Sequence, residues 1–303
     1  MDSLKNLVLT FTKNIHIFLI VWILSFILLA SVSYIIPEKY QAKMVLVTSE
    51  DSRSQLQSIG GAGALASLAG VSIKSEASRS QKALAKIKSK SFFIDIIANH
   101  GEQILPSLIA AKNYDRESGI LGFNKEIYSN SIWYEKKDFD LNGNVFVDKA
   151  FNSYLLGLRV NENRMSRIIT ITYDHISPEF SYEMLKIILE RMNESQRNAD
   201  QMEAEFAIDF INNSLELHAN NELKRAASDL LERQLVTLMI TESRKYYLLE
   251  PIDGPHIPAS RSFPSRTLIV LLGESLITML LFLWLYFRND LRSVYTNIKS
   301  QSN

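Results

Sequence analysis

The chain has 303 residues, contains 33 basic and 33 acidic side chains, and has no cysteine. Its neutral balance argues against nucleic acid as a partner, because phosphate contacts need a concentrated basic face. The lack of cysteine excludes disulfides and thiolate metal sites, and it suits an oxidising compartment such as a bacterial periplasm.

The first long element is an apolar segment close to the N-terminus. Residues 15–36 are almost entirely apolar and follow a short segment, residues 1–14, that carries Lys5 and Lys13. The run is too long for the apolar centre of a cleaved signal peptide, and it ends at Pro37 without a small-residue cleavage site. We therefore predict a first transmembrane helix that remains as an anchor.

A strand and then a small-residue segment are expected next. Tyr40–Ser49 is rich in β-formers and predicts a strand that starts close to the membrane surface. Residues 52–80 are rich in Ser, Gly and Ala, and their Gly-rich patch contains Gly60, Gly61, Gly63 and Gly70. The composition fits a mobile linker, and leucines at helical spacing within residues 62–69 fit a small helix that packs closely on a neighbour.

The next segment mixes a clear helix with an ambiguous region. Ser89–His100 has one apolar side and predicts an amphipathic helix that ends at Gly101. Residues 114–145 mix Gly, Asn and aromatic residues, among them Trp133 and Tyr134. These two rings fit either sugar stacking or a hydrophobic core, and we do not assign them to a site.

A second helix and a β-hairpin are predicted in the middle of the chain. Asp148–Leu156 has a helical pattern. Two β-rich runs, Leu158–Val160 and Ile168–Tyr173, flank a polar centre, which is typical of a hairpin with its turn at that centre.

The longest helical tract begins at Pro178. Residues 178–246 contain neither glycine nor a further proline, and charged and apolar residues recur at helical spacing. A tract of this length predicts a long helical hairpin that extends beyond a compact core. Its apolar side packs either on a returning helix, from Glu222 to Tyr246, or on a neighbouring subunit. Residues 246–252 then predict a strand beside the first one.

Spaced prolines precede the second apolar segment. Proline fixes its own φ and disfavours helix at the preceding residue, so this stretch is expected to be extended and stiff. The residues of this proline-rich entry are Pro251, Pro255, Pro258, Pro264 and Arg266.

Residues 267–287 have membrane length, about 31 Å as a helix, and predict a second transmembrane helix. Basic residues follow the second span in the segment 288–303, and Lys5 and Lys13 precede the first span. Because basic residues next to a span favour the cytoplasmic side, both termini are expected in the cytoplasm. Residues 37–266 then form one periplasmic domain. Only sixteen residues follow the second span, so no fused kinase or sensor output domain is expected.

Glu274 is the one ionisable residue inside the second span. Its burial in hydrocarbon costs about 2 to 3 kcal/mol on insertion scales. We interpret it as an intramembrane contact to a helix or a partner, and snorkelling to the interface is the alternative.

Signatures of catalysis are missing from the sequence. There is no phosphate-binding GxxxxGK[ST] loop and no G-x-S-x-G elbow, and the five histidines are scattered. We therefore predict no catalytic residue, no metal site and no cofactor.

Taken together, these features resemble the Wzz-type polysaccharide co-polymerases, the chain-length determinants of lipopolysaccharide O-antigen. The resemblance rests on the two terminal spans and on four local stretches. These are the proline-rich entry, the small-residue run Gly60–Gly70, the Ile176-Ser-Pro178 start of the long helix, and the segment Leu231–Met239.

The resemblance implies an α/β periplasmic domain with a long extended helix, anchored in the inner membrane of a Gram-negative bacterium. It also implies a bell- or barrel-shaped homo-oligomer, often an octamer. Such proteins act with the O-antigen polymerase and set the modal length of undecaprenyl-linked polysaccharide without catalysing bond formation. Glu274 departs from the expected pattern. Capsule or exopolysaccharide export components share the two-helix plan and remain the alternative.

Overall fold

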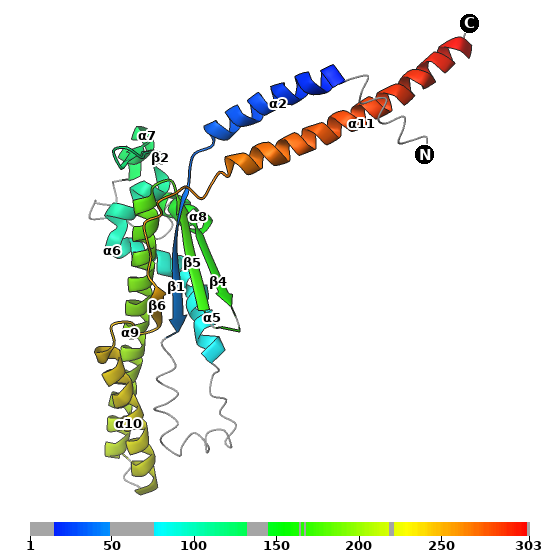
Figure 1. The fold of residues 1–303 in the computed structure, drawn as a ribbon. Coiled ribbons are helices and arrows are strands. Elements are labelled where there is room, and N and C mark those ends of the chain that lie inside the picture. The colour runs from blue at the N-terminus through cyan, green and yellow to red at the C-terminus, as the bar shows by residue number, and fades with distance from the viewer. Residues whose placement is uncertain are drawn as a thin grey trace. The chain divides into compact units, whose positions relative to one another are not determined.

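The computed structural model describes residues 15–48, 76–131, 145–163, 165–166, 168–217 and 221–301 (Figure 1). The chain divides into two compact units. The two-helix unit comprises Met1–Lys39 and Arg261–Asn303, and the middle unit comprises Tyr40–Ser260. The Gly-rich patch with its expected helix or linker, and both Trp133 and Tyr134, lie outside the described residues.

The two-helix unit consists of α2 (Ile15–Ile35) and α11 (Arg266–Gln301), which pack on each other. Each contains a window that is long and apolar enough to cross a membrane, Phe18–Ile35 in α2 and Arg266–Trp284 in α11. The helix of α11 continues past residue 287, where the predicted span ends. No proline or glycine follows Gly273 in α11 to interrupt it.

A four-stranded antiparallel sheet forms the centre of the middle unit, in the order β4-β5-β1-β6. Its strands are β1 (Tyr40–Thr48), β4 (Leu158–Asn163), β5 (Ile168–His175) and β6 (Leu249–Asp253). The predicted first strand, the β4–β5 hairpin and the return of the chain beside β1 are thus confirmed. Alternate residues of β1 and β5 point into the core, as expected for a sheet with one covered face; they are Ala42, Met44, Leu46, Ile169, Ile171 and Tyr173.

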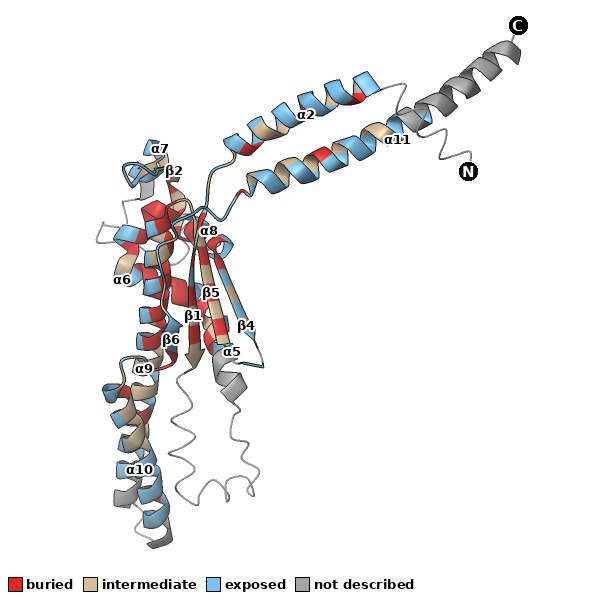
Figure 2. Ribbon diagram, in the orientation of Figure 1, coloured by how far each residue is buried: buried red, intermediate tan, exposed pale blue. Residues whose placement is uncertain are grey.

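Helices cover the buried face of this sheet. The helix α9 (Pro178–Leu217) packs on β1 and β5, and α8 (Val145–Gly157) packs on β5. Both contact α6 (Lys90–Ile109), which also contacts α5 (Glu76–Ile87). Figure 2 shows that buried residues gather at the sheet and the adjoining helices, whereas the far half of the α9–α10 hairpin is largely exposed.

The helix α6 does not end at Gly101, contrary to the sequence prediction. It begins at the N-cap Ser89, whose hydroxyl accepts the Phe92 N–H, and kinks at His100 (φ −133°, ψ 18°). Gly101 lacks the positive φ of a helix-ending glycine, and the apolar side continues beyond it into buried Ile104 and Leu105. Core packing therefore extends the element to Ile109.

A second, two-stranded sheet was not predicted. It joins β2 (Ala111–Asp115) to β3 (Ile120–Phe123), and α7 (Lys125–Ser131) follows. Gly119 has φ +67°, a conformation that glycine adopts without strain. The Asp115 carboxylate accepts hydrogen bonds from the Ser118 hydroxyl and the Glu117 N–H, and these bonds lower the pKa of Asp115.

The long helix α9 has 40 residues, which corresponds to about 60 Å. Ser177 caps its start by accepting the Phe180 N–H at 3.1 Å. The helix α10 (Asn221–Ser243) packs back on α9, so the expected returning helix is confirmed. The middle unit therefore carries a helical hairpin that extends beyond its sheet (Figure 1).

Asn193 joins this hairpin to the sheet. Its side-chain oxygen accepts the backbone N–H groups of Tyr247, Leu248 and Leu249, all within 3.0 Å. Its amide group donates to the carbonyls of Leu249 and Leu189, each at 2.9 Å. The buried Asn193 side chain thus pairs four backbone groups of residues 247–249, where the chain leaves the hairpin and enters β6. The fifth group that it pairs is the Leu189 carbonyl of α9.

Candidate functional site

The candidate site lies in the two-helix unit, where the chain passes from α2 and returns to α11. Lys39 and Phe263 form an isolated antiparallel bridge. The Lys39 N–H donates to the Phe263 carbonyl at 2.8 Å, and the Ser262 N–H donates to the Lys39 carbonyl at 2.8 Å. The outgoing and returning segments are therefore held side by side next to the two apolar helices.

A shared carboxylate reinforces this pairing. One oxygen of Glu38 accepts hydrogen bonds from both Arg261 and Arg266, the latter at 2.7 Å. The Arg266 guanidinium also lies over the Tyr34 ring, 4.1 Å from its centroid. Arg266, the first residue of α11, thus contacts the end of α2 and the residues just after it.

Sequence reasoning singled out Arg266 but missed its partners Glu38 and Tyr34. The sequence did contain a signal for the Glu38 contact. An acidic residue just after the first span and a basic residue just before the second come close together when the first span ends and the second begins on the same side of the membrane.

A second contact joins the two helices within their apolar windows. Glu274 is buried, and its Oε1 accepts a hydrogen bond from the Ser25 hydroxyl at 2.8 Å. The neighbouring Gly273 permits close approach, because a Cβ built there would lie 2.7 Å from Leu29 Cδ1. The Glu274 side chain thus contacts α2, the other helix of its own chain.

The prolines of the entry lie in extended chain. Pro251 is in β6, an edge strand that tolerates the missing N–H. Pro255 and Pro258 follow in a non-helical segment, whose Ala259 carbonyl accepts a hydrogen bond from Arg116 at 3.0 Å. Pro264 comes two residues before α11. The four glycines Gly60, Gly61, Gly63 and Gly70 lie outside the described part of the chain.

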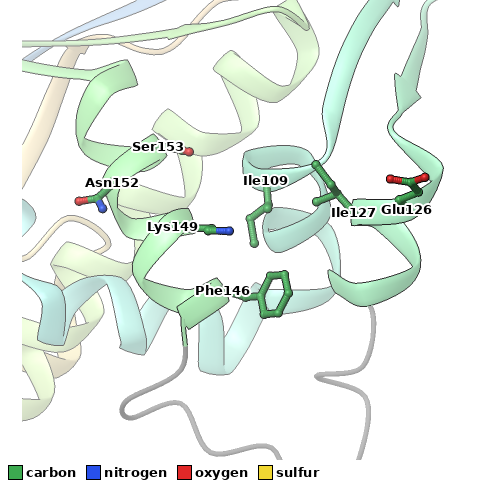
Figure 3. A pocket seen from close by; sticks show the side chains of 7 residues that line it. All are labelled: Ile109, Glu126, Ile127, Phe146, Lys149, Asn152 and Ser153. Carbon is green, nitrogen blue, oxygen red and sulfur yellow. The ribbon is translucent and has the colours of Figure 1, made fainter.

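Two of the surface cavities that the described residues form lie in the middle unit. The larger, about 540 Å³, is lined by Ile109, Glu126, Ile127, Phe146, Lys149, Asn152 and Ser153 (Figure 3). Its Lys149 ammonium lies over the Phe146 ring at 5.7 Å. The second, about 440 Å³, is bordered by Glu179 and Glu183 of α9 and by β3. In the second cavity the Ser177 hydroxyl donates to the Glu179 carboxylate at 2.9 Å, and the same hydroxyl caps α9. No metal-binding cluster of His, Cys, Asp or Glu was found among the described residues.

No protein-family model and no curated protein sequence matches this chain. Among solved structures, the chain is similar to a full-length bacterial polysaccharide co-polymerase, with 11% identity, coverage of 94% of this chain and 97% of that chain, and a TM-score of 0.38. It is also similar to a fragment of WzzB, a polysaccharide co-polymerase from Salmonella Typhimurium, with 13% identity, coverage of 75% and 100%, and a TM-score of 0.28. Both belong to the class that the sequence motifs resemble, and both TM-scores lie below 0.5.

Proposed function

We propose that this protein is a non-catalytic regulator of polysaccharide chain length. In this proposal it acts as a homo-oligomeric co-polymerase beside the inner-membrane O-antigen polymerase, and it sets the modal length of the undecaprenyl-linked O-antigen. Both termini lie in the cytoplasm, and the middle unit lies in the periplasm.

The observation that carries the proposal is the paired entry. The bridge between Lys39 and Phe263 and the Glu38–Arg266 ion pair join the segment that follows α2 to the segment that leads into α11. Both of these helices have membrane length. In this proposal the chain is anchored in the bilayer at both ends of its middle unit, residues 40–260.

The long hairpin supplies the second support. A helix of about 60 Å is longer than the four-stranded sheet requires, since strands of five to nine residues span at most about 30 Å. In this proposal the hairpin serves as an extended scaffold beside the growing polymer. The stretches that resemble the co-polymerase family include the start of this helix at Pro178 and the segment Leu231–Met239 of α10.

The test is deletion of the gene in its host, followed by gel electrophoresis of the surface polysaccharide. We expect the clustered ladder of the wild type to become a random, short-weighted one. Expression of the wild-type protein should restore the cluster, whereas Arg266→Ala and Pro258→Ala should restore it incompletely. Arg159→Ala, the same substitution at an exposed position on β4, serves as the matched control and should restore it fully.

Two outcomes would contradict the proposal. An unchanged ladder after deletion would exclude a role in O-antigen length. An unchanged ladder with loss of capsule from the cell surface would instead assign the protein to capsule or exopolysaccharide export, the alternative with the same two-helix plan.

A further inference from the structure

His175 is held in place through both nitrogens of its ring. Its Nδ1 lies 3.1 Å from the Ser177 backbone nitrogen, and its Nε2 lies 3.1 Å from the Ser107 carbonyl oxygen. A backbone N–H can only donate a hydrogen bond, and a carbonyl can only accept one. These partners therefore assign the proton of the ring to Nε2 and leave Nδ1 as an acceptor, which makes the imidazole neutral.

This ring joins three elements of the middle unit. His175 is the last residue of β5, Ser107 lies in the last turn of α6, and Ser177 caps the start of α9. The ring also packs on Phe180 in the first turn of α9, with 4.3 Å between the two ring centroids. The neutral imidazole thus fixes how the chain turns from the sheet into the long helix.

A second proton on the ring is incompatible with this arrangement. The imidazolium ion has an N–H at both nitrogens and no acceptor. Its Nε2–H can keep the Ser107 carbonyl, but its Nδ1–H would point at the Ser177 N–H, and two donors do not bond each other. Ser177 is buried, so its N–H would lose its partner without gaining water, which is unfavourable.

The surroundings offer the charged ring a different partner. The Glu179 carboxylate stands at the same junction, where it accepts hydrogen bonds from the Ser177 hydroxyl at 2.9 Å and from the Tyr114 hydroxyl at 2.7 Å. The last turn of α6 is the negative end of that helix, and residues 103–110 contain no charged side chain. Both features favour a positive charge on His175, whereas the Ser177 N–H opposes it.

Two other carboxylates lie near this junction. The Asp174 carboxylate, on the same strand as His175, is bonded to Arg159 and to Gln41, each at 2.7 Å. Glu183 is one turn further along α9 and borders the same cavity as Glu179. Of the three carboxylates, Glu179 is the one that accepts a hydrogen bond from Ser177, so we take it as the partner of the charged ring. The remaining titratable groups on the adjoining elements are Tyr40 of β1, Tyr114 of β2, Arg116 in the turn after β2, and Lys186 of α9.

We propose that His175 is a pH-sensitive switch at the start of α9. Its neutral ring holds the Ser177 N–H and completes the junction, and its protonated ring gives up that N–H and bonds the Glu179 carboxylate. The junction is complete above the pH at which the ring takes up a proton, and it opens as the pH falls through that value, within the range of about pH 5 to 8 in which histidine changes charge. The switch lies within the middle unit, so it does not depend on the proposed role in polysaccharide length.

The test measures hydrogen–deuterium exchange of peptides that contain Ser177, in the purified full-length protein over a series from about pH 8 to about pH 5, with each rate corrected for the intrinsic effect of pH. We expect the start of α9 to exchange at least about fivefold faster at the lower end. His175→Gln has an uncharged side chain with an acceptor and a donor, so its corrected exchange should not change with pH. Glu179→Gln removes the second partner and should move the change to a lower pH. The matched control is His256→Gln, which alters a histidine whose side chain is 75% exposed and should behave as the wild type.

Three outcomes overturn the inference. Exchange that does not change with pH in the wild type would show that no switch operates at this junction. An equal change in His175→Gln would assign the effect to another group. If His175→Gln exchanges rapidly at every pH, Glu179→Gln decides, because a midpoint equal to that of the wild type would reject the exchange of partners. None of these results bears on the polysaccharide ladder, so the proposed function is tested separately.

Discussion

Asn193 has the most demanding hydrogen-bonding environment of the described residues. Its oxygen serves three backbone donors at once, and its amide group serves two carbonyls, one of them in β6. Asparagine is well suited to this place, because it combines an acceptor with two lone pairs and a two-proton donor in one short side chain. This residue joins the hairpin to the sheet through polar contacts that hydrophobic patterning does not reveal.

Asn193→Ala should destabilise the middle unit by about 3 kcal/mol or more, because it leaves several buried backbone groups without partners. Thermal unfolding of the purified full-length protein measures this cost. Asn198→Ala, the same change at an exposed position of the same helix, should shift the free energy of unfolding by no more than about 0.5 kcal/mol. Equal effects of the two substitutions would show that the five hydrogen bonds contribute little.

Arg266 is predicted to act through Glu38. Both residues are partly exposed, and the second arginine, Arg261, bonds the same oxygen. Glu38→Gln should therefore reproduce the change in polysaccharide length that Arg266→Ala causes, and the double variant should be no worse than either single one. Additive effects on the gel would mean that Arg266 acts through Tyr34 or another group.

At the scale of elements, the packing of α2 against α11 depends on a glycine. Gly273→Ala would place a methyl group 2.7 Å from Leu29 Cδ1, so the helices must separate or Leu29 must shift. We expect a lower unfolding temperature of the full-length protein, and Leu29→Ala in the same chain should recover part of it. Gly254→Ala is the matched control, since no atom lies within 4 Å of its Cβ position. A Gly273→Ala variant as stable as the control would contradict this packing.

The Ser25–Glu274 hydrogen bond is the polar part of the same contact. Glu274→Leu removes the acceptor, whereas Glu274→Gln retains a side-chain oxygen of similar reach. We therefore expect Glu274→Leu and Ser25→Ala to weaken assembly and the control of polysaccharide length, and Glu274→Gln to stay close to the wild type. Membrane hydrogen bonds of this kind contribute about 1 kcal/mol, so partial loss is expected. An unchanged complex with an unchanged polysaccharide in Glu274→Leu would reject the proposed role.

The elements that the sequence predicted well are those with a strong local period. The alternation in β1 and β5, the long tract after Pro178 and the two apolar runs each reflect a single repeating environment. The errors have tertiary causes. Gly101 lies in a helix because buried Ile104 and Leu105 continue the apolar side, and the β2–β3 hairpin depends on a turn with Gly119 at positive φ inside a polar stretch. In the candidate site, Arg266 was found from its position, whereas Glu38 and Ser25 were missed because their partners are more than 200 residues away.

At the scale of the whole molecule, the two units divide the work of the proposed function. In that proposal the two-helix unit sets where the chain enters and leaves the bilayer, and the middle unit provides a sheet from which a long hairpin extends. Asn193 ties the hairpin to β6, where the proline-rich entry begins with Pro251. In the proposed homo-oligomer, a substitution in the hairpin can alter how copies assemble while the residues of α2 and α11 stay the same.

Phe206→Glu tests this separation. The side chain is 75% exposed, so an acidic residue there should leave the fold intact and cost little stability in a single chain. If copies of the proposed homo-oligomer pack through this exposed side of α9, the same carboxylate is buried in the contact, where an unpaired charge is strongly unfavourable. We expect the mass of the detergent-extracted protein to fall toward that of a single chain, with a matching loss of polysaccharide length control.

The matched control is Met165→Glu, because Met165 is also a large apolar residue, is 97% exposed, and lies in the β4–β5 turn rather than in the hairpin helices. This variant should keep the wild-type mass and the wild-type polysaccharide. If Phe206→Glu also keeps its mass, copies assemble through some other surface. If it loses mass but retains length control, the single chain is the active species, and the long hairpin acts on the polysaccharide without its neighbours.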